Sequence, residues 1–327
     1  MNGGGTSVMD DSTFTQYVHD SPEWHEKRAA HVGSSEVSAL YDLAPEDTPN
    51  YLKSQFALWH IKAGNAPPLF TENPRIKWGI RLEAVIAEAA AEENKWSVQK
   101  GGYFSDRECP GLGASLDYVI DYDPTEKGPG VLEIKNTDWL VHKRSWQTEP
   151  PPHILLQLMH QLAATGYSWG AVCCLIGGND LRTYRYKARP VLLADIRRRV
   201  REFWASIESG DEPKVDGSES ASEVLKSLYP IVVDDVIDLR ENNEFPEAAH
   251  GLYMAAEARK VVEAEYEEAK NRVIQLLDGH RRAFGGGWSV NTSVTPANPG
   301  RQPKPGELIG KRRESRSYTA KEMERPE

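Results

Sequence analysis

The sequence predicts an α/β fold in which short strands and amphipathic helices alternate along one core of residues 21–210. Three observations support this prediction. Residues 75–94 carry apolar side chains at three- and four-residue spacing, which is typical of an amphipathic helix. Residues 113–123 and 130–136 have strand character and are joined by the turn-rich sequence PTEKGPG, which predicts a hairpin. Residues 150–166 begin with three prolines and end at a glycine, which predicts another helix.

The other elements of the core follow in order along the chain. Residues 21–43 predict a helix, a tight turn at Gly33–Ser35 and a second helix capped by a serine. Further strands are expected at residues 102–105, 169–178 and 181–188, followed by a helix at 190–210. The apolar stripe of helix 75–94 is expected in the core and consists of Trp78, Leu82, Val85, Ile86 and Ala89. The other tryptophans that are mostly expected in the core are Trp24, Trp59, Trp139, Trp146 and Trp169.

The regions outside this core differ in composition. Residues 1–20 resemble a flexible lead. Residues 211–290 begin with a polar linker and continue into a helical C-terminal extension, whose long Ala/Glu/Lys-rich helix is expected at 248–277. We expect that helix to pack as an antiparallel appendage or to form a partner-binding coil. Residues 291–327 are charged and Pro-rich, which predicts a disordered tail.

Composition sets limits on the function. The chain has 327 residues, three cysteines and a formal net charge of -10. It lacks both an apolar run long enough for a membrane span and the pattern of a signal peptide. Three cysteines fit neither a disulfide framework nor a zinc site of the usual spacing, so a reducing cytoplasm is expected. The net charge argues mildly against a nucleic-acid partner, although residues 182–201 contain eight basic residues and one acid; alone, they fit a solvated surface.

The chemistry is expected where the hairpin strands meet. Side chains two residues apart on a strand share a face, so Ser115 pairs with Asp117 and Glu133 with Lys135. The hairpin would bring Asp117 close to Glu133 and Lys135. Two adjacent carboxylates repel unless a cation lies between them, and oxygen ligands suit Mg²⁺ or Mn²⁺. A lone Glu-x-Lys on a strand is more often a solvent-facing ion pair. Other parts of the sequence are therefore needed to distinguish an active site from such a pair.

The hairpin resembles that of the PD-(D/E)xK nuclease superfamily, in which one strand carries Asp and the next carries Glu-x-Lys. Five ordered motifs over about residues 22–210 are similar to lambda-exonuclease-type phage recombination nucleases, the YqaJ-like viral recombinase family. They are RAAHVGSSEVSALYDLAP with LWHIKAG, KWGIRLEAVIAEAAAE, GASLDYVIDYDP, GVLEIKNT and ILLQLMHQLAATG. The resemblance implies a nuclease core with a central mixed β-sheet flanked by helices.

The same resemblance assigns roles to individual residues. It places Asp117, Glu133, Lys135 and Gln157 in the catalytic site, with Gln161 one turn further along the same helix. The implied metal ligands are Glu83, Asp117, Glu133 and the carbonyl of Ile134, and the implied cofactor is Mg²⁺, for which Mn²⁺ would substitute. Arg28, Ser35 and Ser115 correspond to the residues that hold a 5′-terminal phosphate. Leu116 replaces the proline of the superfamily name, and Asp106 is only a loose counterpart of an additional upstream aspartate.

The resemblance implies a metal-dependent DNA exonuclease that acts 5′→3′ on double-stranded DNA ends. It would produce single strands for phage-type homologous recombination in the cytoplasm of a bacterial host. It also implies a single-strand annealing partner and a homo-oligomeric ring such as a trimer, with no membrane association. The alternatives are a single-strand or structure-selective repair nuclease of the same superfamily and a catalytically inactive DNA-binding module. A common relative among the repair nucleases holds an iron–sulfur cluster on four cysteines, which three cysteines do not match.

Several of these residues also have ordinary structural explanations. Glu83 fits a carboxylate on a helix surface, and Arg28 could form an ion pair with Glu26 or Glu36. Gln157 and Gln161 could form the wet side of an amphipathic helix.

Overall fold

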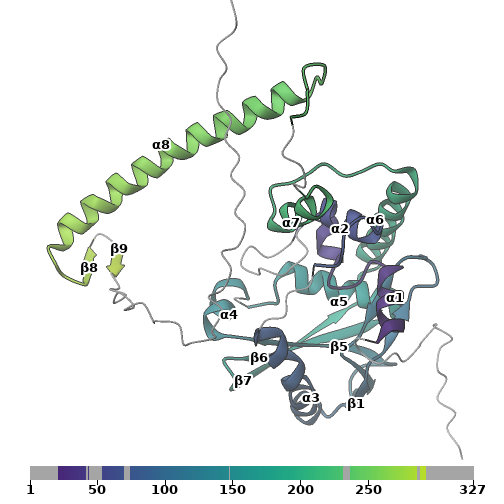
Figure 1. Ribbon diagram of the computed structural model, residues 1–327. Coiled ribbons are helices and arrows are strands. Elements are labelled where there is room, and N and C mark those ends of the chain that lie inside the picture. Colours follow the sequence, from purple (N-terminus) through teal and green to yellow (C-terminus); the bar gives the residue numbers. More distant parts are fainter. Residues whose placement is uncertain are drawn as a thin grey trace, which may run out of the picture. The chain divides into compact units, whose positions relative to one another are not determined.

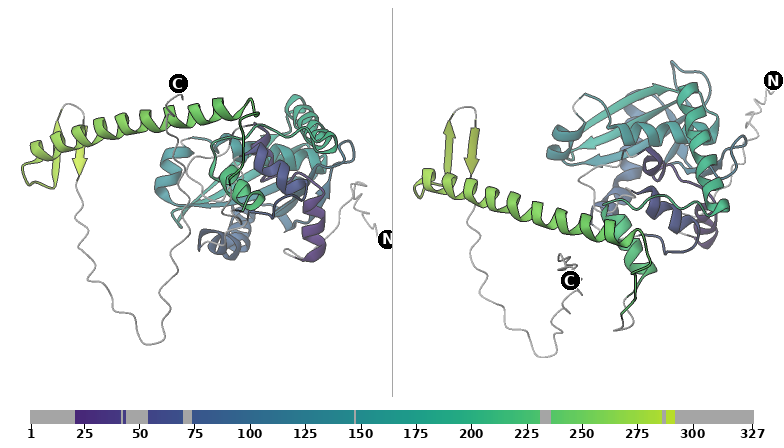
Figure 2. Two further views of the ribbon diagram at one scale, coloured as in Figure 1. Left: turned by 45° about the horizontal axis from the view of Figure 1, so that its top comes forward. Right: turned by 90° about the horizontal axis from the view of Figure 1, so that it is seen from above.

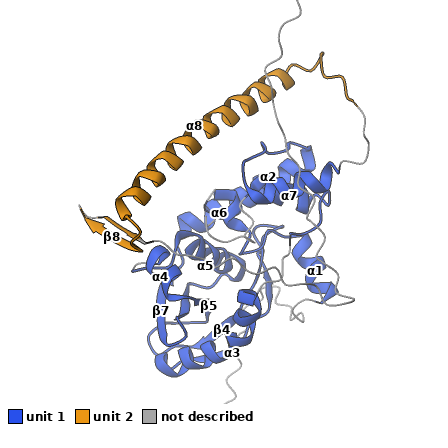
Figure 3. Ribbon diagram, turned by 60° about the vertical axis from the view of Figure 1, so that its left-hand side comes forward, with its two compact units in different colours: residues 1–232 blue, residues 233–327 orange. Residues whose placement is uncertain are grey.

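The computed structural model describes residues 21–41, 43, 54–69, 74–146, 148–230, 236–285 and 288–291. The chain divides into two compact units, Met1–Val232 and Val233–Glu327 (Figure 3). The first unit therefore extends beyond the core boundary expected at residue 210. The predicted lead, and the tail after residue 291, lie outside the described residues. Among the helices described, none is long and apolar enough to cross a membrane.

A five-stranded mixed sheet forms the centre of the first unit (Figure 1). The strand order is β1-β4-β5-β6-β7, and only β5 and β6 run parallel. The strands are β1 (Ser97–Lys100), β4 (Tyr118–Tyr122), β5 (Gly130–Thr137), β6 (Trp169–Ile176) and β7 (Asp180–Lys187). This sheet confirms the predicted α/β fold with a central mixed sheet, and the buried Cys173 and Cys174 lie on β6.

Helices cover both faces of the sheet (Figure 1). Helix α3 (Pro74–Asn94) packs on the face that carries Ile120, Leu132 and Ile134. Helices α5 (Pro152–Thr165) and α6 (Pro190–Ser209) pack on the opposite face, which carries Val131 and Val172. The smaller helices of the unit are α1 (Pro22–Ala29), the 3₁₀ helix η1 (Val37–Tyr41), α2 (Gln55–Lys62), α4 (Trp139–Ser145) and α7 (Glu219–Leu228).

The predicted strand at residues 113–123 is broken at its middle. Strand β3 (Gly113–Ser115) pairs with β2 (Tyr103–Ser105) in a separate two-stranded sheet, whereas β4 pairs with β1. The chain changes sheets at Leu116 and Asp117, where the N–H of Gly101 donates to the Asp117 carbonyl at 2.9 Å. A Cβ atom on Gly101 would clash with the Leu116 carbonyl oxygen, so glycine permits this close approach.

Two of the predicted core tryptophans are exposed. Trp78 and Trp139 each expose 55% of their surface, and Val85 of the predicted stripe is also exposed. Helix α3 buries Ile86, Ala87 and Ala90 in its C-terminal half, so its apolar contact with the sheet is shorter than the sequence pattern predicted. The other four tryptophans of that group are buried as expected: Trp24, Trp59, Trp146 and Trp169.

Helix α7 lies within the segment predicted to be a polar linker. It begins at an N-cap serine, Ser218, and buries Ala221 and Val224 against Phe56 and Ala57 of α2. Serines and acids alternate at the start of this helix, so its short amphipathic pattern was not recognised in the sequence. In the second unit, α8 (Phe245–Leu277) is followed by the hairpin β8 (Arg282–Gly285) and β9 (Trp288–Asn291) (Figure 2).

The basic run at residues 182–201 is largely neutralised by carboxylates. Arg185 lies 2.8 Å from Asp123, and Arg197 lies 2.6 Å from Asp106. Six of the eight basic side chains contact an acid: Arg182, Arg185, Lys187, Arg197, Arg198 and Arg199. Carboxylates therefore balance most of this charge, and the pairs with the buried Asp123 and Asp106 stabilise the fold.

Candidate active site

The β4–β5 hairpin brings Asp117 and Glu133 together. The antiparallel register pairs Tyr118 with Leu132, and its continuation places Asp117 opposite Glu133. Directly opposed residues of an antiparallel pair project from the same face of the sheet. Asp117 lies one residue before β4, so its side chain sits where the two strands stop pairing. The sequence predicted that these two residues lie close together, although it placed Asp117 within a continuous strand.

Four polar contacts fix the side chains around Glu133, which is 2% exposed. Lys135 Nζ lies 2.5 Å from Oε1 of Glu133 and donates to Gln157 Oε1 at 3.1 Å. Gln157 Nε2 donates to the same Glu133 oxygen at 2.7 Å, and Gln161 Nε2 donates to Oε2 at 2.6 Å. Both glutamines are buried, so they do not form the wet side of their helix. They hold the Glu133 carboxylate in one orientation.

Asp117 faces the same cluster from the neighbouring strand. Its Oδ2 accepts a hydrogen bond from the N–H of Ile134 at 2.8 Å. Burial, followed by the carboxylates of Glu133 and Glu83, raises the pKa of Asp117 well above its ordinary value. Lys135 and the Ile134 N–H oppose this rise. The carboxylates of Asp117, Glu133 and Glu83 are therefore close enough to repel one another.

The donor set fits a hard divalent cation. The N–H and C=O of one strand residue project to the same side, so the Ile134 carbonyl also projects toward Asp117. Two carboxylates and a carbonyl are oxygen ligands of the kind that Mg²⁺ and Mn²⁺ accept, and a cation would relieve the repulsion at Asp117. Among the described residues, no group of three or more His, Cys, Asp or Glu side chains is arranged to hold a metal ion. Glu83 contacts Lys100 instead, so it must leave that ion pair to act as a further ligand.

A histidine that the sequence analysis did not select lies near Lys135. His153 is half-buried at the start of α5, and burial followed by the charge of Lys135 lowers its pKa to about 4. The imidazole is therefore neutral at physiological pH. His153, Gln157 and Gln161 follow one another at four-residue spacing, which places them on one helix face. That spacing in HILLQLMHQ could have identified the residue.

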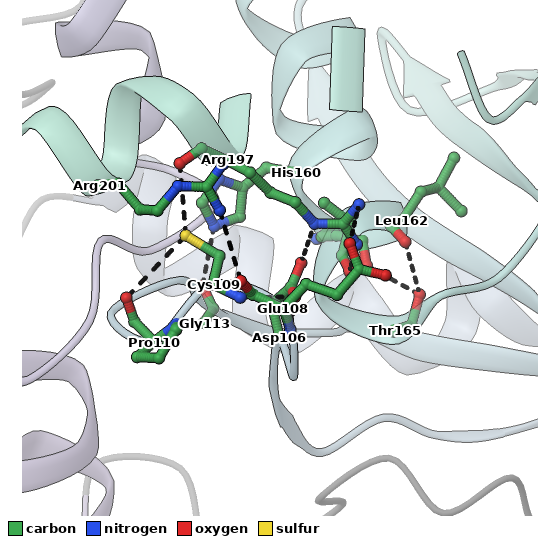
Figure 4. Close-up of polar contacts among 12 residues, drawn as sticks. Asp106, Glu108, Cys109, Pro110, Gly113, His160, Leu162, Thr165, Arg197 and Arg201 are labelled. Carbon is green, nitrogen blue, oxygen red and sulfur yellow. Dashed lines mark hydrogen bonds and ion pairs between the residues drawn. The ribbon is translucent and has the colours of Figure 1, made fainter. Parts of the chain in front are cut away.

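Asp106 has a structural environment and does not extend the carboxylate cluster. Its Oδ2 accepts from Arg197 Nε at 2.6 Å, and its Oδ1 accepts from the backbone N–H groups of Glu108 and Cys109 (Figure 4). Arg197 also donates to the Ala163 carbonyl at 3.3 Å. These contacts attach the β2–β3 connection to α5 and α6. Asp106 therefore does not supply the additional upstream aspartate.

Two of the three residues assigned to a terminal phosphate, Arg28 and Ser115, contact one indole ring. Trp24 Nε1 donates to Ser115 Oγ at 3.1 Å, and the Arg28 guanidinium lies 4.5 Å from the Trp24 ring centroid. Helix α1 is thereby placed next to β3, two residues before Asp117. The structure thus brings Arg28 and Ser115 to the same side chain.

Ser35 belongs to the turn that precedes η1, beside a buried ion pair that the sequence analysis did not identify. Glu36 Oε2 lies 2.9 Å from Lys62 Nζ and accepts the N–H of Gly33 at 2.7 Å. Its other oxygen lies 3.7 Å from Arg28, so the predicted Arg28–Glu36 pair also forms. Burial raises the pKa of Glu36, but Lys62 and Arg28 outweigh it, and the net pKa is lowered. Two cations therefore surround one carboxylate, which leaves an excess positive charge beside Ser35.

Comparison with known proteins finds one matching family model and one curated relative. The family model of the YqaJ-like viral recombinase domain matches residues 23–168, which include every candidate site residue. Residues 23–168 are therefore similar to a YqaJ-like viral recombinase domain. The Bacillus subtilis (strain 168) protein YqaJ, described as uncharacterized, is 26% identical over 274 residues, which are 82% of each chain.

Among solved structures, several exonucleases are similar to this YqaJ-like chain. LHK-Exo, an alkaline exonuclease from Laribacter hongkongensis that was also crystallised with dAMP, is 22% identical. The dAMP complex aligns with a TM-score of 0.48 over 58% of this chain and 94% of the other. A phage-related exonuclease from Haemophilus somnus 129PT is 12% identical and aligns with a TM-score of 0.37, over 54% of this chain and 95% of its own.

Proposed function

We propose that this chain is a metal-dependent DNA exonuclease. One observation supports this most directly: Asp117, Glu133 and Lys135 converge at the end of one hairpin, where burial and then the neighbouring carboxylates raise the pKa of Asp117. A buried carboxylate cluster with one lysine is suited to phosphodiester hydrolysis. A YqaJ-like viral recombinase domain is the setting in which such a site would act on DNA.

Each side chain would have a defined role in hydrolysis. Asp117, Glu133 and the Ile134 carbonyl would hold Mg²⁺, with Mn²⁺ as a substitute, and the bound ion would polarise the phosphate and lower the pKa of water. Lys135 would orient the attacking water and balance negative charge that develops on the phosphate. Gln157 and Gln161 would keep Glu133 fixed while the phosphate changes geometry. Glu83 would complete the ligand set after leaving Lys100.

The finer proposal is 5′→3′ digestion of double-stranded ends for phage-type recombination. Arg28 and Ser115 support it, because both contact Trp24 and Ser115 lies two residues before Asp117. Ser35 belongs to the turn of Glu36, which Arg28 also contacts. A terminal phosphate has more negative charge and more acceptor oxygens than an internal one, and an arginine fork suits it. An annealing protein partner, a ring-shaped oligomer and the cytoplasm of a bacterial host belong to the same proposal.

Digestion of three substrates tests this function. Linear duplex, circular duplex and circular single strand are incubated with Mg²⁺, with Mn²⁺, with Zn²⁺ and with excess chelator. We expect nucleotides to be released only from the linear duplex, with Mg²⁺ or Mn²⁺ and poorly with Zn²⁺. Cleavage of the circular single strand would instead indicate a structure-selective nuclease. DNA binding without any cleavage would indicate an inactive binding module.

A further inference from the structure

Helix α8 carries an unbroken heptad pattern over its whole length. Its first heptad positions are Phe245, Leu252, Arg259, Tyr266 and Val273, at intervals of seven residues. The residue three positions after each of these is, in order, Ala, Ala, Val, Ala and Leu. We call these ten positions the α8 seam. Nine of them are apolar and one is arginine, which is the a/d pattern of a coiled coil.

The seam is not covered by the other described elements of its unit. Leu252, Val262, Tyr266 and Leu276 are exposed, and among the described residues of α8 only Leu277 is buried. The only other elements described in this unit are the two short strands of the β8–β9 hairpin (Figure 2). Within the described residues of the second unit, this apolar stripe is therefore left without a covering element.

The period and length of the seam indicate what that helix must be. A strict seven-residue repeat drifts about 20° per heptad on a straight helix, so five heptads need a partner that winds alongside throughout. Helix α8 has 33 residues, whereas the next longest described helix, α3, has 21. No other described helix of the chain can accompany the seam to its end. The α8 of a second copy has the matching length and pattern.

The charges beside the seam fit a parallel pair of identical helices. Glu265 directly precedes Tyr266, which is a first heptad position, and Lys270 lies five residues after Glu265. In a parallel two-stranded coiled coil these two positions face each other across the interface. Glu265 would then meet the partner's Lys270, and the contact would occur twice by symmetry. Arg259 is the single charged seam residue, a type of substitution that fixes register and oligomeric state at a cost in stability.

We propose that α8 is a self-association helix, which pairs in parallel with α8 of a second copy through the α8 seam. This proposal is independent of the nuclease function, because none of the site residues lies on α8.

Two adjacent valines provide a matched test. Val262 lies on the seam and Val261 lies off it, and their exposures are 62% and 59%. Val262→Glu and Val261→Glu make the same chemical change in equivalent surroundings of the free helix. Sedimentation velocity of the full chain should show association of wild type and Val261→Glu. In Val262→Glu, association should be weakened by about tenfold or more, because a charge would be buried. A monomeric wild type at tens of micromolar, or equal behaviour of both variants, would overturn the proposal.

The parallel orientation of the two α8 helices is tested by introducing a cysteine on the α8 seam. In a parallel pair each first heptad position faces itself, so Leu252→Cys should form an intermolecular disulfide under mild oxidation. Val261→Cys, off the seam, should not, and Cys109, Cys173 and Cys174 are buried. Absence of the Leu252→Cys crosslink in an associated protein would rule out the parallel arrangement. Arg259→Leu should tighten association, since it removes the one charged seam residue.

Discussion

Lys135 Nζ lies 2.5 Å from Oε1 of Glu133, on the strand that ends beside Asp117. The ammonium group balances a carboxylate that is almost completely buried. If Lys135 orients water and stabilises the phosphate, Lys135→Ala should reduce turnover by about 10²–10⁴-fold. DNA affinity in Ca²⁺ should change little, because binding depends mainly on phosphate contacts elsewhere. Glu133→Ala should behave in the same way.

Single-turnover digestion and a filter-binding assay distinguish the two effects. Lys143→Ala on α4 is the matched control, because Lys143 is exposed and lies outside the cluster. Unchanged turnover in Lys135→Ala and Glu133→Ala would refute the assignment of the site.

Gln161 is the second test of the arrangement around Glu133. It is completely buried, and its Nε2 donates to Glu133 Oε2 at 2.6 Å. Gln161→Leu keeps a similar volume but leaves that carboxylate oxygen without its donor. The free energy of unfolding should fall by about 1–3 kcal/mol, with a loss of turnover as Glu133 reorients. Gln99→Leu on exposed β1 makes the same change and should have little effect on either measurement.

The raised pKa of Asp117 predicts a gain in stability when its charge is removed. A carboxyl group whose folded-state pKa is raised stabilises the fold below its unfolded-state pKa, and this contribution is lost as pH rises through the folded-state pKa. At pH 7 without metal, Asp117→Asn should therefore melt at a higher temperature than wild type, by about 2–4 °C per kcal/mol of relieved repulsion. Near pH 3 the Asp117 carboxyl group is protonated and therefore uncharged, like asparagine, so the two proteins should melt at similar temperatures. Thermal scans in chelator across this pH range measure the difference.

The same carboxyl group links metal binding to proton release. The proton on Asp117 must leave before a cation binds, so Mg²⁺ binding should weaken as pH falls. Because the pKa of Asp117 is raised, this weakening should begin at a higher pH than for an ordinary aspartate. Calorimetric titration in buffers of different ionisation enthalpy should show protons released by wild type, and Asp117→Asn should lose both the release and the thermal stabilisation by Mg²⁺. Binding enthalpies of wild type that do not depend on the buffer would contradict this linkage.

Much of the fold followed from local patterns. The hairpin at 113–136 and helices α3 and α5 were identified because turn residues, prolines and periodic apolar side chains act over short distances. The break at Leu116 was missed, since it depends on β2 and on the close approach of Gly101, which are contacts between distant segments. The exposure of Trp78 was missed for a similar reason: periodicity defines a helix face but not how far the sheet extends beneath it.

The candidate site also combines residues that local spacing predicts with residues that only the fold brings together. Asp117, Glu133 and Lys135 share a hairpin, so spacing alone placed them together. Glu36 and Lys62 come from segments with no common periodicity, and only the fold reveals that they form a buried pair. His153 is an intermediate case, because its four-residue spacing from Gln157 was visible in the sequence, whereas its proximity to Lys135 was not.

The last prediction concerns recognition of the DNA end and rests on the proposed terminal-phosphate site. Arg28 lies 4.5 Å from the centroid of the Trp24 ring, and Trp24 donates to Ser115, two residues before Asp117. Glu36 does not cancel the local charge, because Lys62 lies closer to it than Arg28 does. A 5′-phosphate held here would fix the scissile bond near the carboxylates, so its effect should appear in the rate as well as in affinity.

We therefore expect wild type to degrade a duplex with a 5′-phosphate faster than the same duplex with a 5′-hydroxyl. Charge-assisted hydrogen bonds contribute about 1.5–3 kcal/mol each, so Arg28→Ala should remove a preference of roughly tenfold or more. Lys27→Ala is the matched control, because this neighbouring cation on α1 is exposed. The rate on the 5′-hydroxyl duplex should stay near the wild-type value in both variants, since the metal ligands are unchanged. Equal rates of wild type on the two ends, or an equal loss of preference in the Lys27 variant, would exclude Arg28 as the phosphate-binding residue.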